Sequence, residues 1–127
     1  MKSNHKILIP SLLFLIGIAF ACEKNEITTG LEGTVFKGPI NPVEIIGQVN
    51  DAPFAAEFHV YDNKDKFVKS FLSDESGSYS VMLEPGDFKI IPDRNAPIIM
   101  PEHQAKEITI DGGNIKKQDL YFDTGIR

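Results

Sequence analysis

Acidic pairs in two predicted turns are the first candidates for chemistry in this sequence. Asp62 and Asp65 share one turn, and Asp74 and Glu75 share the next. Calcium takes six to eight oxygen ligands, and a calcium loop alternates Asp or Asn around a glycine at a fixed offset. Residues 74–77 lack that alternation, whereas Asp and Ser commonly bond their own backbone to close a turn. We therefore predict turn closure and no metal site.

Histidines and nucleophiles offer little more. His59 is expected on the outer face of a strand and His103 in a loop, without a cysteine or second histidine at zinc-ligand spacing. The sequence has no Gly-x-Ser-x-Gly nucleophile elbow. We predict no catalytic residue, no cofactor and no metal, so the chain is not expected to be an enzyme.

Lys69 and Asn114 present one covalent alternative. In some adhesin modules a core Lys and an Asn condense beside a carboxylate. Lys69 is expected to share a strand face with Phe67 and Phe71, and Asn114 precedes the last predicted strand. The opposing interpretation places Lys69 at a sheet edge with its stem along the surface, and the high cost of an isolated buried Lys favours it.

The only cysteine, Cys22, follows a segment with the form of an export signal. Lys2, His5 and Lys6 give a positive start, and residues 7–21 are uncharged and mostly apolar. This run is shorter than the ~20 apolar residues that span a bilayer, and it ends in small residues, as cleaved signal peptides do. A lone thiol would be a liability in an oxidising compartment unless it is consumed as an anchor.

The residues before the cysteine, Ala19-Phe20-Ala21-Cys22, resemble the lipobox of bacterial lipoproteins, with Ala19 where Leu is usual. The resemblance implies a cysteine lipidated on its sulfur, which attaches the mature chain to a membrane. Glu23 follows, and not the Asp that favours inner-membrane retention in enteric bacteria. We therefore expect an outer-membrane lipoprotein of the cell envelope, facing either the periplasm or the surface.

The expected organisation is a signal peptide over residues 1–21, a lipidated tether over residues 22–30 and one domain over residues 31–127. The whole sequence has a net charge of −5, and loss of Lys2 and Lys6 makes the mature chain more acidic. An acidic balance argues against nucleic acid as a partner, since phosphate backbones bind cationic surfaces.

Short alternating segments separated by turn residues recur through the mature chain. This spacing predicts an all-β, antiparallel, seven-stranded β-sandwich. The seven expected strands are Leu31–Phe36, Ala55–Asp62, Lys66–Ser73, Tyr79–Leu83, Phe88–Ile91, Glu107–Ile110 and Asp119–Phe122. A further short strand at Val43–Val49, in the long loop after the first, is left open.

The stretch from Ser73 to Ile91 has the clearest pattern. Tyr79, Val81 and Leu83 alternate on one face, and the same period resumes after a Pro-Gly turn. This pattern predicts a β-hairpin whose apolar face lies in the core. In Lys66–Ser73 the face is ambiguous, because the apolar residues fall on both sides.

Motifs along the domain resemble those of the carboxypeptidase regulatory-like domain. They comprise Gly33-x-Val35, Pro53, Ala56-x-Phe58-x-Val60-Tyr61-Asp62, and Ser73-Asp74-x-x-Gly77-x-Tyr79-x-Val81-x-Leu83-x-Pro85-Gly86-x-Phe88. The resemblance implies a prealbumin-like (transthyretin-like) sandwich with a non-catalytic role, and it supplies no active-site residues.

The loop of Ile98, Ile99 and Met100 lies between Pro97 and Pro101 and is the candidate partner contact. These apolar side chains either cap the open end of the sandwich or form an exposed patch for an envelope protein. We expect a non-catalytic binding or structural module. The alternative is an accessory that holds glycan or peptide for an outer-membrane uptake or secretion complex.

Overall fold

The computed structural model describes residues 27–127, so the predicted signal peptide and Cys22 lie outside the described residues. The described chain is almost all β, without an α-helix. In order it comprises β1 (Gly30–Gly38), β2 (Ala52–Pro53), β3 (Glu57–Asp62), β4 (Phe67–Leu72), β5 (Ser78–Met82), β6 (Gly86–Pro92), the 3-10 helix η2 (Pro101–His103), β7 (Lys106–Ile110), β8 (Ile115–Lys117) and β9 (Leu120–Asp123). Within these residues no helix is long and apolar enough to cross a bilayer.

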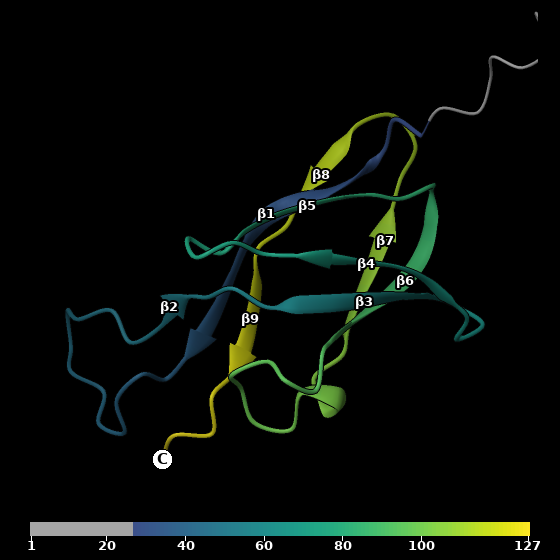
Figure 1. The fold of residues 1–127 in the computed structure, drawn as a ribbon. Helices are drawn as coiled ribbons and strands as arrows, with labels where there is room; N and C mark the ends of the chain where they lie inside the picture. Colours follow the sequence, from purple (N-terminus) through teal and green to yellow (C-terminus); the bar gives the residue numbers. More distant parts are fainter. Residues whose placement is uncertain (1–26) are drawn as a thin grey trace, which may run out of the picture.

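The strand count and the pairing correct the sequence-based prediction. The described residues form nine strands where seven were expected, because β2 and β8 are short additions of two and three residues. β1 is the central strand of a five-stranded sheet, bordered by β5 and β2 on one edge and by β8 and β9 on the other. The β1–β8 and β1–β9 pairs are parallel, so this sheet is not wholly antiparallel (Figure 1).

The second sheet has four strands in the order β4-β3-β6-β7, all antiparallel. Its inner face carries the predicted core residues Phe58 and Val60, whereas Glu57, His59 and Tyr61 alternate onto the outer face as predicted. The term "outer face" below means this side of the four-stranded sheet.

A β-bulge resolves the ambiguous face of β4. Lys69 pairs with Val60, but Phe67 pairs with Tyr61. Val68 is therefore an extra residue on β4 with no partner between Val60 and Tyr61 on β3. The bulge moves Phe67 to the outer face, whereas Phe71 stays in the core. Simple alternation, which places both phenylalanines on one face, was therefore wrong for this strand.

The predicted central hairpin is also corrected. β5 pairs with β1, whereas β6 pairs with β3 and β7, so Ser73–Ile91 links the two sheets and forms no hairpin. Its facing residues were predicted correctly, since Tyr79, Val81 and Leu83 are buried. Alternation specifies which face of a strand is apolar, but it does not specify the neighbouring strand.

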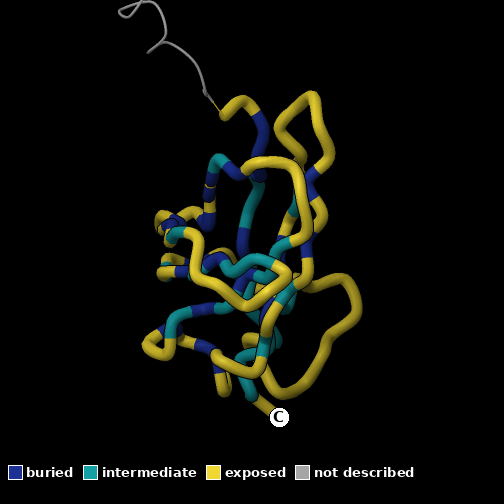
Figure 2. The backbone as a smooth tube through the Cα atoms, turned by 90° about the vertical axis from the view of Figure 1, so that its right-hand side faces the viewer, coloured by how far each residue is buried: buried dark blue, intermediate teal, exposed yellow. Residues whose placement is uncertain are grey.

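Side chains from both sheets meet in one hydrophobic cluster. Phe58 of β3 lies 5.6 Å from Phe122 of β9 between ring centroids, and Phe71 of β4 stacks on Tyr79 of β5 at 5.2 Å. Buried positions follow the strands, and exposed positions follow the connecting loops (Figure 2). The described strands thus share a core that fixes the surface loops around it.

Candidate partner-binding surface

The loop between β1 and β2 is a feature that sequence analysis misjudged. The short strand left open at Val43–Val49 does not form, and residues 41–49 are bends and turns without strand pairing. Figure 1 shows this loop projecting from the molecule beyond β2. Pro42 and Gly47 interrupt the apolar residues, and Gly47 has a φ of +89°, which favours a turn over a strand.

Asn50 closes the base of this loop. Its Oδ1 accepts hydrogen bonds from the backbone N–H groups of Ile40 at 3.0 Å and Asn41 at 2.8 Å. Its Nδ2 donates to the carbonyl oxygen of Asn41 at 3.2 Å, and the Ile40 N–H also bonds the Asn50 carbonyl at 3.0 Å. These hydrogen bonds fix the two ends of the loop relative to each other. They therefore limit the conformational entropy that the loop would lose on binding a partner.

The tip of the loop exposes large aliphatic side chains. Ile46 is 101% exposed, and four further residues of the loop are also exposed: Ile40, Val43, Ile45 and Val49. We call residues 40–49 the apolar loop. Large apolar side chains gathered at a solvent-facing site are characteristic of interaction surfaces.

The proline-bounded loop divides between the two roles predicted for it. Ile98 is 9% exposed and belongs to the core cluster. Ile99 is 43% exposed and Met100 is 57% exposed, so only these two face solvent. Ile98 therefore caps the core, whereas Ile99 and Met100 form the exposed part of the loop.

Gln104 connects the proline-bounded loop to the C-terminal segment by hydrogen bonds. Its Nε2 donates to the carbonyl oxygens of Ile99 at 2.6 Å and Asp123 at 2.9 Å, and its Oε1 accepts from the Asp123 N–H at 2.8 Å. The Ile99 N–H bonds the Asp123 carbonyl at 3.0 Å. Ile99 also lies against Gly125, where φ is +87° and a Cβ would overlap the isoleucine.

The C-terminal segment in turn meets the base of the apolar loop. The Thr124 N–H bonds the Gly38 carbonyl at 2.9 Å, and its Oγ1 donates to the Pro39 carbonyl at 2.6 Å. Arg127 pairs with Asp123 at 3.0 Å, and this guanidinium and the Gly125 N–H lower the pKa of the Asp123 carboxyl. These contacts connect several segments that carry exposed apolar residues, namely the apolar loop, the loop with Ile99 and Met100, and the C-terminal segment with Tyr121 and Ile126.

Substitutions in the proline-bounded loop test this division. We expect Ile99→Asp to lower the free energy of unfolding by only about 1 kcal/mol, because the new carboxylate stays in contact with water. Ile98→Ala should cost about 2–3 kcal/mol, because it leaves a cavity in the core. Urea unfolding of both variants measures the difference, and equal losses would contradict the division.

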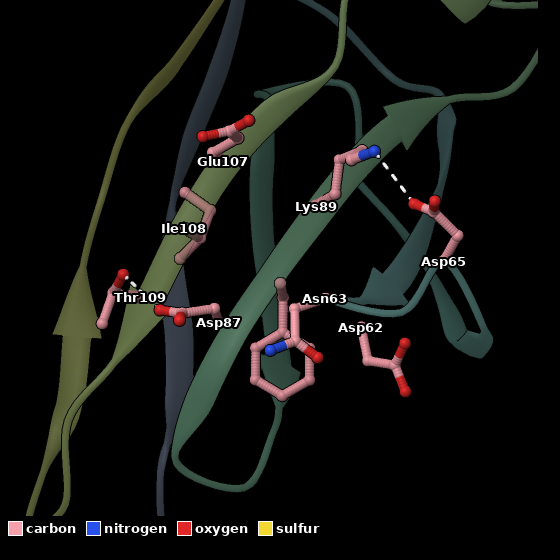
Figure 3. A pocket seen from close by; sticks show the side chains of 9 residues that line it. Asp62, Asn63, Asp65, Asp87, Lys89, Glu107, Ile108 and Thr109 are labelled. Atoms are coloured by element: carbon pink, nitrogen blue, oxygen red, sulfur yellow. Dashed lines mark hydrogen bonds and ion pairs between the residues drawn. The ribbon is translucent and has the colours of Figure 1, made fainter.

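The outer face carries a second surface feature, a polar pocket of about 550 Å³ at the end near the β3–β4 turn (Figure 3). Lys89 of β6 pairs with Asp65 of the turn at 3.0 Å, and Thr109 of β7 donates to Asp87 at 2.8 Å. Asp62 accepts from the backbone N–H groups of Lys64 and Lys66, and those bonds lower its pKa. Three acids of the pocket are thus engaged in structural bonds.

The second acidic turn is confirmed as a turn closure. Asp74 Oδ1 accepts from the N–H groups of Ser76 and Ser78, each at 3.0 Å, and from the Ser76 hydroxyl at 3.0 Å. Lys69, the candidate for a covalent bond, is partly buried, and its Nζ donates to the Met82 carbonyl at 2.7 Å. Asn114 is exposed in the loop before β8.

The structure brings together one constellation that sequence reasoning missed. His59 Nε2 lies 2.9 Å from Asp93 Oδ1, and His59 Nδ1 lies 2.8 Å from Ser70 Oγ. The His59 hydrogen bond and the Asn95 N–H lower the pKa of Asp93. Glu57 lies two residues before His59 on the same strand face. This Glu-x-His spacing is the one feature of the sequence that could have pointed to the cluster.

Several solved structures resemble this fold, three of them as follows. One is a DUF3823 family protein from Bacteroides ovatus, with a TM-score of 0.51 and 23% identity over 75% of this chain and 44% of that chain. Another is a DUF3823 family protein from Parabacteroides merdae, with a TM-score of 0.51 and 14% identity over 76% of this chain and 47% of that chain. The third is the Bacillus anthracis TIE protein, with a TM-score of 0.49 and 21% identity over 75% of this chain and 17% of that chain.

The two DUF3823 family proteins, at 23% and 14% identity, show similarity of fold alone. The chain spans less than half the length of either DUF3823 family protein. No protein-family model matches the sequence, and the search of curated proteins gave no significant match.

Proposed function

We propose that this chain is a non-catalytic, lipid-anchored module of the cell envelope that binds an envelope protein through the apolar loop. The observation that carries the proposal is the full exposure of Ile46 among four other exposed aliphatic side chains. Residues 38–51 contain two acids and neither Lys nor Arg, so anionic lipid headgroups do not attract this loop. A protein with an apolar groove fits it better.

The proposal includes a finer assignment of the fold as a prealbumin-like sandwich related to the carboxypeptidase regulatory-like domain. Its support is that seven strands of four or more residues remain when the short β2 and β8 are set aside. The motif residues Gly77, Tyr79 and Leu83 occupy buried positions, as the resemblance implies.

The anchor is the second part of the proposal, and its support is the sequence around Cys22. We expect Cys22→Ser to abolish incorporation of labelled palmitate, because the acceptor sulfur of the lipid is lost. Metabolic labelling followed by precipitation of the protein measures this. A Ser78→Ala variant should label like the parent, and equal labelling of the Cys22→Ser variant would remove the anchor from the proposal.

Binding through the apolar loop is tested by crosslinking in cells. A photoreactive amino acid at Gln48 should capture a defined partner, and Ile46→Asp should reduce that product at least tenfold by placing a charge in the apolar contact. The Ile46→Asp variant should unfold within about 0.5 kcal/mol of the parent, because the side chain is exposed.

Leu72→Asp is the matched control, since Leu72 is an exposed aliphatic residue on β4. It should leave the Gln48 crosslink unchanged. A crosslink that survives Ile46→Asp, or a product that contains only lipid, would overturn the assignment of a protein partner to this loop.

A glycan or peptide accessory is the second candidate, and one observation favours it. Phe67 is 58% exposed on the outer face and lies edge-on to Tyr61, with ring centroids 5.9 Å apart, and Tyr61 directly precedes Asp62 of the polar pocket. Exposed aromatic rings beside polar groups suit stacking on a sugar or a peptide side chain. Binding that is lost in Phe67→Ala but kept in Ile46→Asp would support this candidate over the first.

A further inference from the structure

We propose that Glu57, His59 and Asp93 bind one divalent transition-metal ion on the outer face, with zinc as the ion that best suits the set. The side chains come from the start of β3 and the residue after β6. The candidate ligand atoms of the three residues all lie within 4.8 Å of one another. One imidazole nitrogen and two carboxylates are ordinary zinc donors.

The separation of two of these atoms suits a shared ion. Two ligands about 2.0–2.1 Å from zinc lie about 2.9 Å apart at a right angle and about 3.4 Å apart in a tetrahedron. His59 Nε2 and Asp93 Oδ1 are 2.9 Å apart. An ion can therefore replace the proton between them with only a small change in side-chain position, and Glu57 supplies the third ligand.

Ser70 allows the histidine to make this exchange. The Asp93 carboxylate only accepts hydrogen bonds, so without metal it assigns the proton of this contact to Nε2, and in the neutral ring Nδ1 then accepts from the Ser70 hydroxyl. A metal needs the lone pair of Nε2, so the proton moves to Nδ1. The serine hydroxyl both donates and accepts, and it then accepts from Nδ1–H. Such an outer hydrogen bond is what fixes the orientation of a metal-binding histidine.

The backbone holds the carboxylates in register with the histidine. The Asp93 N–H donates to the Glu57 carbonyl at 2.9 Å, which ties the end of β6 to the start of β3. The Asn95 N–H bonds Asp93 Oδ2 at 3.0 Å and leaves Oδ1 directed at His59. Glu57 is exposed, and its side chain has no hydrogen bond to another described residue, so it is free to turn toward an ion.

Three protein ligands leave at least one position open on the ion. That position faces solvent on the outer face, because Glu57 is exposed and His59 and Asp93 are only partly buried. The ion would join β3 to β6 and present a site for an oxygen ligand. This inference is independent of the proposed partner at the apolar loop, which uses none of these residues.

Titration calorimetry with zinc chloride tests the inference on the purified full-length chain in detergent, without a histidine tag. We expect one ion per chain, and at least tenfold weaker binding in His59→Gln and in Glu57→Gln. Cobalt should give a visible absorption band that His59→Gln abolishes. His103→Gln is the matched control, because His103 is exposed and outside the cluster, and it should bind zinc like the parent.

Glu57→Gln keeps the test independent of folding, because Glu57 is exposed and its side chain has no hydrogen bond to a described residue. Absence of zinc binding by the parent chain would overturn the inference. It would equally be overturned if His59→Gln and His103→Gln weakened binding to the same extent, since the ion would then bind elsewhere.

Discussion

Gly33→Ala is expected to destabilise the protein by about 3 kcal/mol, at the upper end of the range for overpacking. A Cβ at Gly33 would overlap the backbone carbonyl of Gln118, which lies against Gly33 in the link between β8 and β9. This carbonyl cannot shift freely, because the Gln118 N–H bonds the Glu32 carbonyl at 2.9 Å and Asp119 Oδ1 accepts from the Thr34 N–H at 2.9 Å. Urea unfolding followed by circular dichroism measures the loss.

Gly112→Ala provides the matched glycine control. A Cβ there meets no atom within 4 Å, and Gly112 does not have a positive φ. We expect its stability to stay within about 0.5 kcal/mol of the parent. If Gly33→Ala behaves like Gly112→Ala, the described position of the Gln118 carbonyl against Gly33 is wrong.

Tyr79→Ala should cost about 3–5 kcal/mol, the usual range for truncating a buried aromatic residue. Tyr79 stacks on Phe71 and is buried between the sheets. Its hydroxyl donates to the Gln118 carbonyl, and burial, followed by the charge of Asp119, raises its pKa well above the usual range. The hydroxyl therefore stays protonated and remains a donor over the pH range in which the protein is handled. Urea unfolding of the variant measures the cost.

Tyr79→Phe separates the hydroxyl from the ring. It keeps the stacking on Phe71 and should cost only about 1 kcal/mol, the net value of one hydrogen bond. A Tyr79→Ala variant as stable as the parent would contradict the position of β5 in the core. Equal costs for the two variants would mean that the hydrogen bond, and not the packing, carries the stability.

Period-two alternation was enough to predict which side chains of β3 and β5 lie in the core. The alternation indicates which face of each strand is buried, because a buried face requires apolar residues at every second position. It could not report that β5 and β6 enter different sheets, because a turn at Pro85 suits a hairpin and a crossing between sheets equally well. The parallel pairing of β1 with β9 is similarly non-local and leaves no mark on either segment.

Sequence reasoning recognised one part of the candidate surface and missed another. Three consecutive apolar residues drew attention to Ile98, Ile99 and Met100, but their spacing does not distinguish a buried from an exposed position in a loop. Val43–Val49 has enough alternation to resemble a strand, and only the lack of a pairing neighbour leaves its side chains in water. The cluster at His59 needs Asp93, which follows a different strand, β6.

β1 has neighbours from both the middle and the late part of the chain. Thr34 of β1 bonds Asp119, 85 residues further along, and β9 forms its parallel partner directly afterwards. Pairings between such distant residues form slowly, because a long chain segment must be ordered before they contribute. While the ribosome is still making the protein, β1 therefore has one unpaired edge. That edge is closed only after residue 123 has emerged, so this fold is completed after translation of its last strand and not during it.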